Sequence, residues 1–168
     1  MTKRSPLQGL LLILVFTFAL SPQAKEVSPK IQSFVQKGWS YQAPSDDPLF
    51  SHPSKDFQGT LTYKELPSLF VFHAEYKGGP KELTQWLNTR YLKGKATSLR
   101  SLPLRIEGKN TLYVNVFQAV IQGDTQIIMM FSQIQNHQVM VLSQNSNLDS
   151  YKKDINEILP FLKKAFSN

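Results

Sequence analysis

The sequence predicts an α+β fold, in which an antiparallel sheet of about five to seven strands is covered by an internal helix and a C-terminal amphipathic helix. Three observations lead to this prediction. Strand-like runs separated by short turn signals fill most of residues 110–144. A stretch with helical spacing separates these runs from an earlier hairpin. Residues 151–166 repeat apolar side chains at the period of an α-helix.

The first residues have the order of a secretory signal peptide. A basic start at Met1–Arg4 precedes the eleven apolar residues Leu10–Leu20 and the small-residue segment Ser21–Ala24. We therefore expect residues 1–24 to be a signal peptide that is cleaved after Ala24, with retention as an N-terminal anchor as the alternative. The apolar run is shorter than the roughly 20 residues that a membrane-spanning helix needs. The expected product is a bacterial protein, periplasmic or secreted, with no transmembrane helix after cleavage.

Composition narrows the classes of function. Cleavage would leave 144 residues, enough for one domain with one core. Without Lys3 and Arg4, 17 cations face 12 acids, a mildly basic balance that favours anionic surfaces such as phospholipid or polyanionic sugar. An exported protein is not expected to meet nucleic acid. The chain has no cysteine, which excludes disulfides, thiolate metal sites and a cysteine nucleophile.

The early part of the mature chain divides into an extension and the start of the folded domain. Residues 25–58 are rich in proline, and we assign them to an N-terminal extension and irregular loop, with a short amphipathic piece at Ile31–Val35. Residues 59–168 then form a single α+β domain. It begins with a hairpin of Gly59–Glu65 and Leu69–Tyr76, in which apolar and polar residues alternate.

A helix is expected over residues 80–92. Pro80 suits the first position of a helix, and Gly94 suits the residue after its end. Three strands should follow, over Asn110–Gln122, Thr125–Gln135 and Gln138–Gln144, joined by tight turns. Their consecutive apolar residues indicate strands that are covered on both faces.

The closing helix carries the strongest periodic signal. Its apolar stripe consists of Tyr151, Ile155, Ile158, Leu159, Leu162 and Phe166. Lys163 and Lys164 lie in the last turn, where cations complement the helix dipole.

The end of the chain resembles the PsbP-like family, which includes the extrinsic PsbP subunit of photosystem II and many small exported bacterial proteins. The strand QVMVLSQN leads through a short turn into SYKKDINEILPFLKKAF, and it follows an early hairpin, a helix and a three-strand meander. The order of elements matches over about residues 57–166, and the residues that carry the match are the apolar stripe of the closing helix. The resemblance implies a binding or assembly accessory protein without a catalytic centre. It supplies no functional residues, because the stripe is a core feature, and the loop from Pro44 to Asp56 has no counterpart in it.

Few residues suggest bond-breaking chemistry. The histidines are His52, His73 and His137, and none lies at metal-ligand spacing from another. Two alternatives remain open: a small periplasmic hydrolase that uses His73 with Glu75, or one that uses a metal held near His52 by the acids of its loop. Neither a nucleophile elbow nor a phosphate-binding loop occurs. We therefore predict no catalytic residues, no metal ligands and no cofactor.

The strongest candidate for a contact surface is the basic stretch around residues 90–105, which has no acid. Its cations could each strengthen attachment to an anionic membrane, although a solvated linker that is partly a strand explains them too. The predicted contact residues are Arg90, Lys93, Lys95, Arg100 and Arg105, with Trp86 and Tyr91 beside them.

These observations favour an exported non-catalytic accessory or binding protein of the bacterial cell envelope. Its expected partner is a protein or an anionic envelope component, reached in part through peripheral membrane contact. The hydrolase is one alternative. A carrier of an apolar ligand is another, and it would need a cavity under the closing helix.

Overall fold

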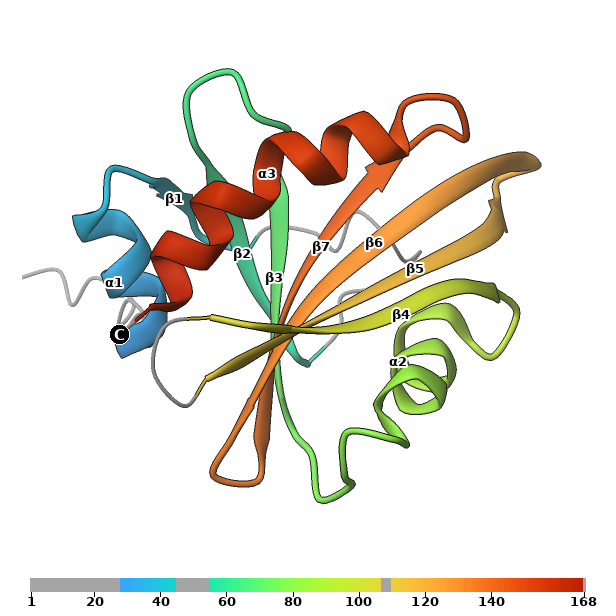
Figure 1. Ribbon diagram of the computed structural model, residues 1–168, viewed down its shortest axis with the longest axis horizontal. Helices are drawn as coiled ribbons and strands as arrows, with labels where there is room; N and C mark the ends of the chain where they lie inside the picture. Colours follow the sequence, from blue (N-terminus) through green and yellow to red (C-terminus); the bar gives the residue numbers. More distant parts are fainter. Residues whose placement is uncertain (1–27, 45–54, 107–109, 168) are drawn as a thin grey trace, which may run out of the picture.

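A single seven-stranded antiparallel sheet organises the protein (Figure 1). The computed structural model describes residues 28–44, 55–106 and 110–167. The strands follow the order β1-β2-β3-β7-β6-β5-β4 across the sheet, so that β1 and β4 form its edges. In chain order the elements are α1 (Pro29–Gln36), β1 (Ser40–Gln42), β2 (Phe57–Thr62), β3 (Leu69–Glu75), α2 (Leu83–Leu92), β4 (Thr97–Arg105), β5 (Thr111–Ile121), β6 (Asp124–Gln135), β7 (Gln138–Ser146) and α3 (Tyr151–Phe166).

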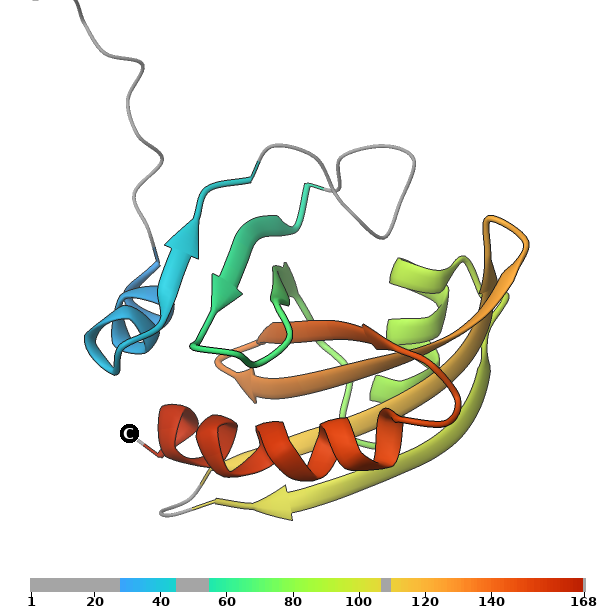
Figure 2. The same ribbon diagram turned by 90° about the horizontal axis from the view of Figure 1, so that it is seen from above.

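The helices cover both faces of the sheet, which explains why the central strands are apolar on both sides. In Figure 2, α2 and α3 lie on opposite sides of β6 and β7. Within β6 the side chains of Met129 and Phe131 belong to the cluster beneath α1 and α3. The alternating Ile128 and Met130 belong to the cluster beneath α2. The predicted α+β architecture with an antiparallel sheet is thus confirmed.

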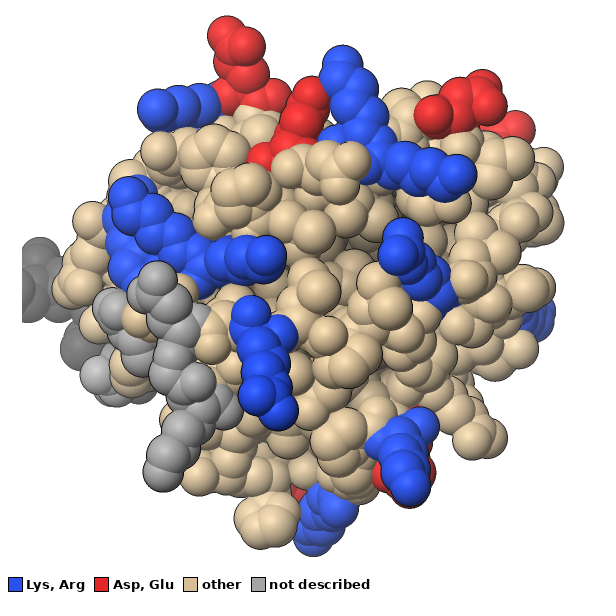
Figure 3. All heavy atoms as spheres, in the orientation of Figure 1, with Lys and Arg blue, Asp and Glu red and all other residues tan. Residues whose placement is uncertain are grey.

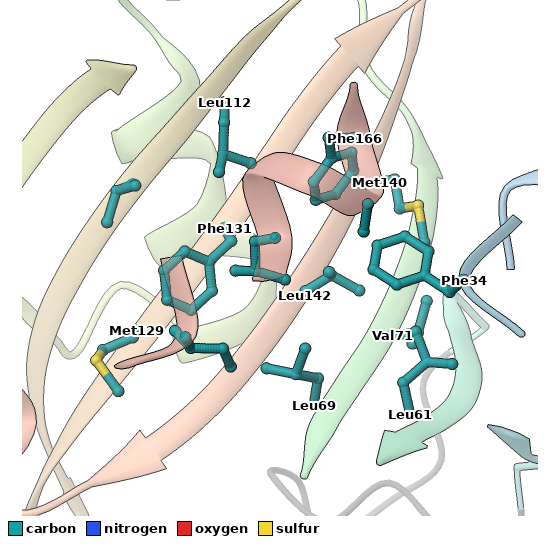
Figure 4. Packing of buried hydrophobic residues seen from close by; sticks show 14 of the residues in the cluster. Phe34, Leu61, Leu69, Val71, Leu112, Met129, Phe131, Met140, Leu142 and Phe166 are labelled. Carbon is teal, nitrogen blue, oxygen red and sulfur yellow. The ribbon is translucent and has the colours of Figure 1, made fainter. Parts of the chain in front are cut away.

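The larger core lies between the sheet and the helices α1 and α3. Phe34 from α1 and Phe166 from α3 meet edge to face, with ring centroids 5.4 Å apart, over the strands near Met140 (Figure 4). Both phenylalanines are fully buried, as are Ile158 and Leu162 of the closing helix. The apolar stripe read from the sequence is therefore the surface that fixes α3 on the sheet.

Helix α1 and strand β1 add to this core from residues that the sequence analysis placed in an N-terminal extension. Ile31 and Phe34 are buried on one side of α1, and Trp39 stacks 5.1 Å from Tyr63. Ser28 caps the helix, because its side chain accepts a hydrogen bond from the Ile31 backbone N–H. The core therefore includes buried residues from Ile31 onward, whereas the sequence analysis began the folded domain at residue 59.

The hairpins of the sheet use the tight turns that the sequence predicted. Asn136 and His137 both have positive φ, 51° and 58°, as the two central residues of a type I′ turn require. The turn between β5 and β6 falls on Gln122 and Gly123, one residue earlier than expected, and both residues have positive φ.

The predicted start of α2 at Pro80 is wrong, since the helix begins at Leu83. Residues 79–82 form a separate turn in which the Glu82 N–H donates to the Gly79 carbonyl oxygen. The Glu82 carboxylate in turn accepts from the Gly79 N–H at 3.0 Å. These two bonds satisfy the backbone before the helix begins, so that Pro80 lies in the preceding turn. None of the helices in the described ranges is long and apolar enough to cross a lipid bilayer.

Candidate functional site

A groove of about 510 Å³ opens between α1 and the neighbouring end of the sheet; we refer to it as the α1 groove. It lies on the face that α1 and α3 cover, beside the apolar core, and its lining is mostly polar. The lining residues are Ser28, Pro29, Lys30, Ile31, Ser33, Gln36, Gln58, Val71, His73, Gln133, Gln135, Asn136, Gln138 and Met140.

The strand register explains why polar side chains gather there. His73 of β3 lies opposite Met140 of β7, and Met140 lies opposite Gln133 of β6, so that these three residues form one row across the sheet. Side chains two residues apart on a strand point to the same face. On the same face, the neighbouring row toward the apolar core consists of Val71, Leu142 and Phe131. The neighbouring row in the opposite direction along the strands is polar and consists of Glu75, Gln138 and Gln135.

Gln133 is the residue of the groove that most strongly indicates a ligand-binding role. It is only 5% exposed, yet no hydrogen bond joins its side-chain amide to another residue in the described part of the chain. The amide is not among the fully buried unpartnered groups of the described residues, so that it reaches the open space of the groove. The imidazole of the half-buried His73 likewise has no hydrogen-bond partner among the described residues. Two groups able to donate and accept hydrogen bonds thus face the groove and are available to a ligand.

The electrostatics of the groove are simple. Among the described residues its lining includes neither Asp nor Glu, and Lys30 is the one lysine. Burial of the Lys30 ammonium, and secondly the charge of Lys37 nearby, lower the pKa of Lys30 below its ordinary value. The lining therefore suits a ligand that exchanges hydrogen bonds with amides and hydroxyls.

Evidence for a catalytic or metal centre is weak in the described residues. Glu75 is exposed and does not line the groove, so that His73 has no carboxylate beside it there. No group of three or more His, Cys, Asp or Glu side chains that could hold a metal occurs in the described ranges. His52, the centre of the suggested metal site, lies outside those ranges.

The first cation of the basic stretch, Arg90, is paired with an acid although its side chain is 44% exposed. The Arg90 guanidinium donates to the Asp56 carboxylate from Nε at 2.5 Å and from Nη2 at 2.8 Å, and the Tyr91 hydroxyl donates to the same carboxylate at 3.1 Å. Arg90 also lies over the Trp86 ring, with its Cζ 5.4 Å from the ring centroid. This network joins α2 to the start of β2.

The network also changes the proton affinity of its members. Hydrogen bonding to Asp56 raises the pKa of Arg90 above its already high ordinary value. Burial, and then the negative charge of Asp56, raise the pKa of Tyr91. Tyr91 is 1% exposed, so the structure places this predicted contact residue in the core.

The remaining cations of the stretch are exposed but separated. Lys93 ends α2 in the left-handed conformation, with φ of 55°, and Lys95 follows it in the connection to β4. Arg100 and Arg105 lie on β4, an edge strand that also carries Pro103. Charged residues and proline on an edge strand hinder pairing with another sheet. The position of Arg100 and Arg105 on an edge strand therefore explains their charge without requiring a partner.

Arg105 belongs to a different neighbourhood from the other four cations. Together with Ile106 and Ser167 it lines a hollow of about 320 Å³ beside Lys163 and Lys164, at the end of α3. We call this site the α3 hollow. No local sequence signal predicts it, because it forms where two segments distant in sequence are packed side by side.

The α1 groove, in contrast, is partly indicated by the pattern of polar residues in the sequence. In β3 and β6 the side chains on the α1 and α3 face are apolar, from Leu69 and from Ile127, until the same row of the sheet. There His73 and Gln133 interrupt the alternation. Polar residues that end an apolar alternation at matching positions of neighbouring strands can mark a site, but only once the register is known.

Comparisons with known proteins support the fold. No family model matches the chain, and no curated protein matches it. Among solved structures, the cyanobacterial PsbP (CyanoP) from Synechocystis sp. PCC 6803 aligns with a TM-score of 0.50 and 9% identity, over 76% of this chain and 80% of that one. LpqN of Mycobacterium tuberculosis, described as involved in cell envelope biogenesis, aligns with a TM-score of 0.43 and 12% identity, over 70% of this chain and 76% of that one.

A third solved structure, the protein of unknown function PA94 from Pseudomonas aeruginosa, aligns with a TM-score of 0.43 and 12% identity. The alignment covers 77% of this chain and 78% of that one. At these identities the comparisons concern the fold, and they confirm the PsbP-like resemblance at that level through CyanoP.

Proposed function

We propose that this chain is an exported, non-catalytic accessory protein of the bacterial envelope that works by binding, with the α1 groove as its binding site. The observation that carries the proposal is the amide of Gln133, which faces the groove and has no hydrogen-bond partner among the described residues, although the residue is only 5% exposed. The described lining of the groove carries no carboxylate, and a polar group that faces a groove without a protein partner is available to a ligand. The volume of the groove is within the range of small-molecule binding sites.

A substitution at Gln133 tests this role. We expect Gln133→Leu to change the free energy of unfolding by less than about 1 kcal/mol, because the amide that it removes bonds no other described residue. The same change should abolish binding of envelope-derived ligands, which can be found by thermal-shift screening of fractionated saccharides and peptides. The matched control is Gln85→Leu on the exposed side of α2, which leaves the groove intact.

Loss of stability in Gln133→Leu would show that the amide has a structural role and would contradict the proposal. Ligand binding that survives in this variant would place the binding site elsewhere.

The hydrolase with His73 and Glu75 is a second candidate, favoured by the position of His73 in the groove. It predicts turnover of ester or glycosidic substrates that His73→Asn and Glu75→Gln both abolish. Binding without turnover, weakened by His73→Asn but not by Glu75→Gln, would instead agree with the binding role. The carrier of an apolar ligand has less support, since the groove lies beside α1 and most of its lining residues are of polar types.

The contact role of the predicted basic surface stays a prediction. Its exposed members Lys93, Lys95 and Arg100 form a set that can be compared directly with the cations of the α3 hollow. The experiment that compares them is described below.

A further inference from the structure

The α3 hollow brings together cations that are far apart in the sequence. Arg105 comes from the end of β4, and Lys163 and Lys164 come from the last turn of α3. The described residues that line the hollow include no acid. Figure 3 shows this face of the molecule: cationic side chains lie over its left and central parts, where α3 ends and β4 runs, and most acidic ones lie along its upper edge, together with further cations.

The three cations of the hollow are not neutralised by salt bridges. In the described residues the salt bridges join Arg90 to Asp56 and Lys153 to Glu157. Neither pair includes a cation of the hollow. Their positive potential is therefore directed to solvent or to a partner.

The end of α3 does not require these lysines as caps. The Lys37 ammonium donates to the carbonyl oxygens of Lys164 and Ala165 at 3.1 and 3.2 Å. The Ser167 hydroxyl donates to the Lys163 carbonyl oxygen at 2.5 Å. Since other groups bond the last carbonyls of the helix, the ammonium groups of Lys163 and Lys164 are left for another role.

Two cations of α1 extend the basic surface toward the groove. Lys37 lies against the end of α3 through the bonds just described. Its charge acts on Lys30, whose pKa is lowered mainly by burial and further by Lys37. Like charges held this close repel each other, and an anion placed near them would relieve the repulsion. Lys30 also lines the α1 groove, so the basic surface and the groove adjoin.

We propose that the α3 hollow, with Lys37 and Lys30 beside it, is the surface by which this protein docks on anionic phospholipid headgroups. This inference goes beyond the proposed binding role of the groove. It implies that docking would bring the mouth of the groove to the membrane surface.

An anionic membrane fits this surface better than a protein partner does. Protein interfaces depend on a few large side chains, often aromatic, that are buried in pockets of the partner. The exposed large apolar residues of the described ranges are Val35, Leu99, Val120 and Leu148, and none of them lines the hollow. Attraction to phospholipid headgroups needs only charge, which is what the hollow offers.

The expected strength follows from the number of cations. A lysine or arginine near an anionic membrane strengthens partitioning by about fivefold, so that three of them contribute about 100-fold. The effect should decay within a Debye length of roughly 10 Å at 0.1 M salt, and binding should therefore weaken steeply as salt is raised.

The test compares two triple variants that remove the same charge. The first is Arg105→Gln, Lys163→Gln and Lys164→Gln, in the α3 hollow. The second is Lys93→Gln, Lys95→Gln and Arg100→Gln, in the basic stretch predicted from sequence. Glutamine preserves helix propensity at Lys163 and Lys164, and the other four positions are exposed and outside helices, so both variants should keep the fold, which a thermal melt verifies. The natively processed protein is sedimented with phosphatidylcholine vesicles that contain or lack phosphatidylglycerol, at low and at high salt.

We expect phosphatidylglycerol-dependent, salt-sensitive binding that falls about 100-fold in the hollow variant and far less in the stretch variant. Equal losses in the two variants would show that net charge alone matters and would overturn the proposal. A larger loss in the stretch variant, or no dependence on phosphatidylglycerol, would overturn it as well. Binding to dextran sulfate without binding to vesicles would reject the lipid as partner. None of these outcomes bears on the groove, which Gln133→Leu tests separately.

Discussion

Two basic regions of this protein, the segment from Arg90 to Arg105 and the α3 hollow, show how charge in a sequence relates to charge on a surface. The segment is continuous in sequence, yet its first cation pairs with Asp56 and the others follow the end of α2 and an edge strand. The hollow joins Arg105 to Lys163 and Lys164, which are remote in sequence but line one concavity. A run of like charges is therefore weak evidence for a site, whereas unpaired charges that share a hollow are stronger evidence.

The largest expected effect on stability concerns Arg90, the cation of the segment that is paired with Asp56. Asp56→Ala deprives Arg90 and Tyr91 of their common acceptor, and we expect it to lower the free energy of unfolding by about 1–3 kcal/mol, measured by urea denaturation. The estimate is at the lower end for buried pairs because the Arg90 side chain is 44% exposed and can turn to water. Asp149→Ala, at an exposed turn, is the control. Equal stability of the two variants would mean that Arg90 is as available as the other cations of the segment.

A smaller effect should appear at alkaline pH. Because the pKa of Tyr91 is raised in the folded state, the fold retains a proton that the unfolded chain releases near pH 10. Stability from Tyr91 is then complete below about pH 10 and is lost as pH rises above it. Tyr91→Phe should therefore flatten the decline in the free energy of unfolding between about pH 9 and pH 11. An unchanged decline would show that other groups, such as the buried Tyr76, dominate it.

The smallest expected effect concerns Lys37. Its substitution distinguishes the capping of α3 from the contribution of charge to vesicle binding at the hollow. Lys37→Gln removes the ammonium that bonds the Lys164 and Ala165 carbonyls, and it should lower the free energy of unfolding by about 0.5–1 kcal/mol. Binding to anionic vesicles should fall by only about fivefold, the share of one cation. Lys152→Gln, on the exposed side of α3, is the control for helix charge. A loss of vesicle binding as large as that of the hollow triple variant would mean that Lys37 organises the whole surface.

Much of the fold could be predicted from the sequence because its signals are local. Each signal depends on residues that are close together in the sequence. Examples are the alternation in β3, the turn residues Asn136 and His137, and the spacing of the apolar residues in α3. Helix α1 was harder, because its eight residues give too short a pattern to show that Ile31 and Phe34 enter the core. The start of α2 was misplaced because Pro80 suits a helix and a turn equally well.

The candidate sites could be predicted much less well. The sequence analysis considered His73 but paired it with Glu75, its neighbour on the strand, whereas the register places Met140 and Gln133 in its row. It assigned Lys163 and Lys164 to the helix dipole, and both do lie in the last turn of α3, but no local pattern showed that Arg105 lies beside them. Tyr91 was expected at the contact surface because it lies beside the basic stretch in sequence, but the helix turns it toward Asp56 and Phe72.

By itself the sequence determined the alternation of strands and helices, the basic balance of charge and the lack of cysteine chemistry, since these depend on residue type and short-range order. Only the tertiary structure decided which amides remain without partners in the α1 groove and which cations meet in the α3 hollow. The reason is physical: strand register and the packing of helices on the sheet are fixed by contacts between distant segments, and they bring side chains together at distances that no local pattern encodes.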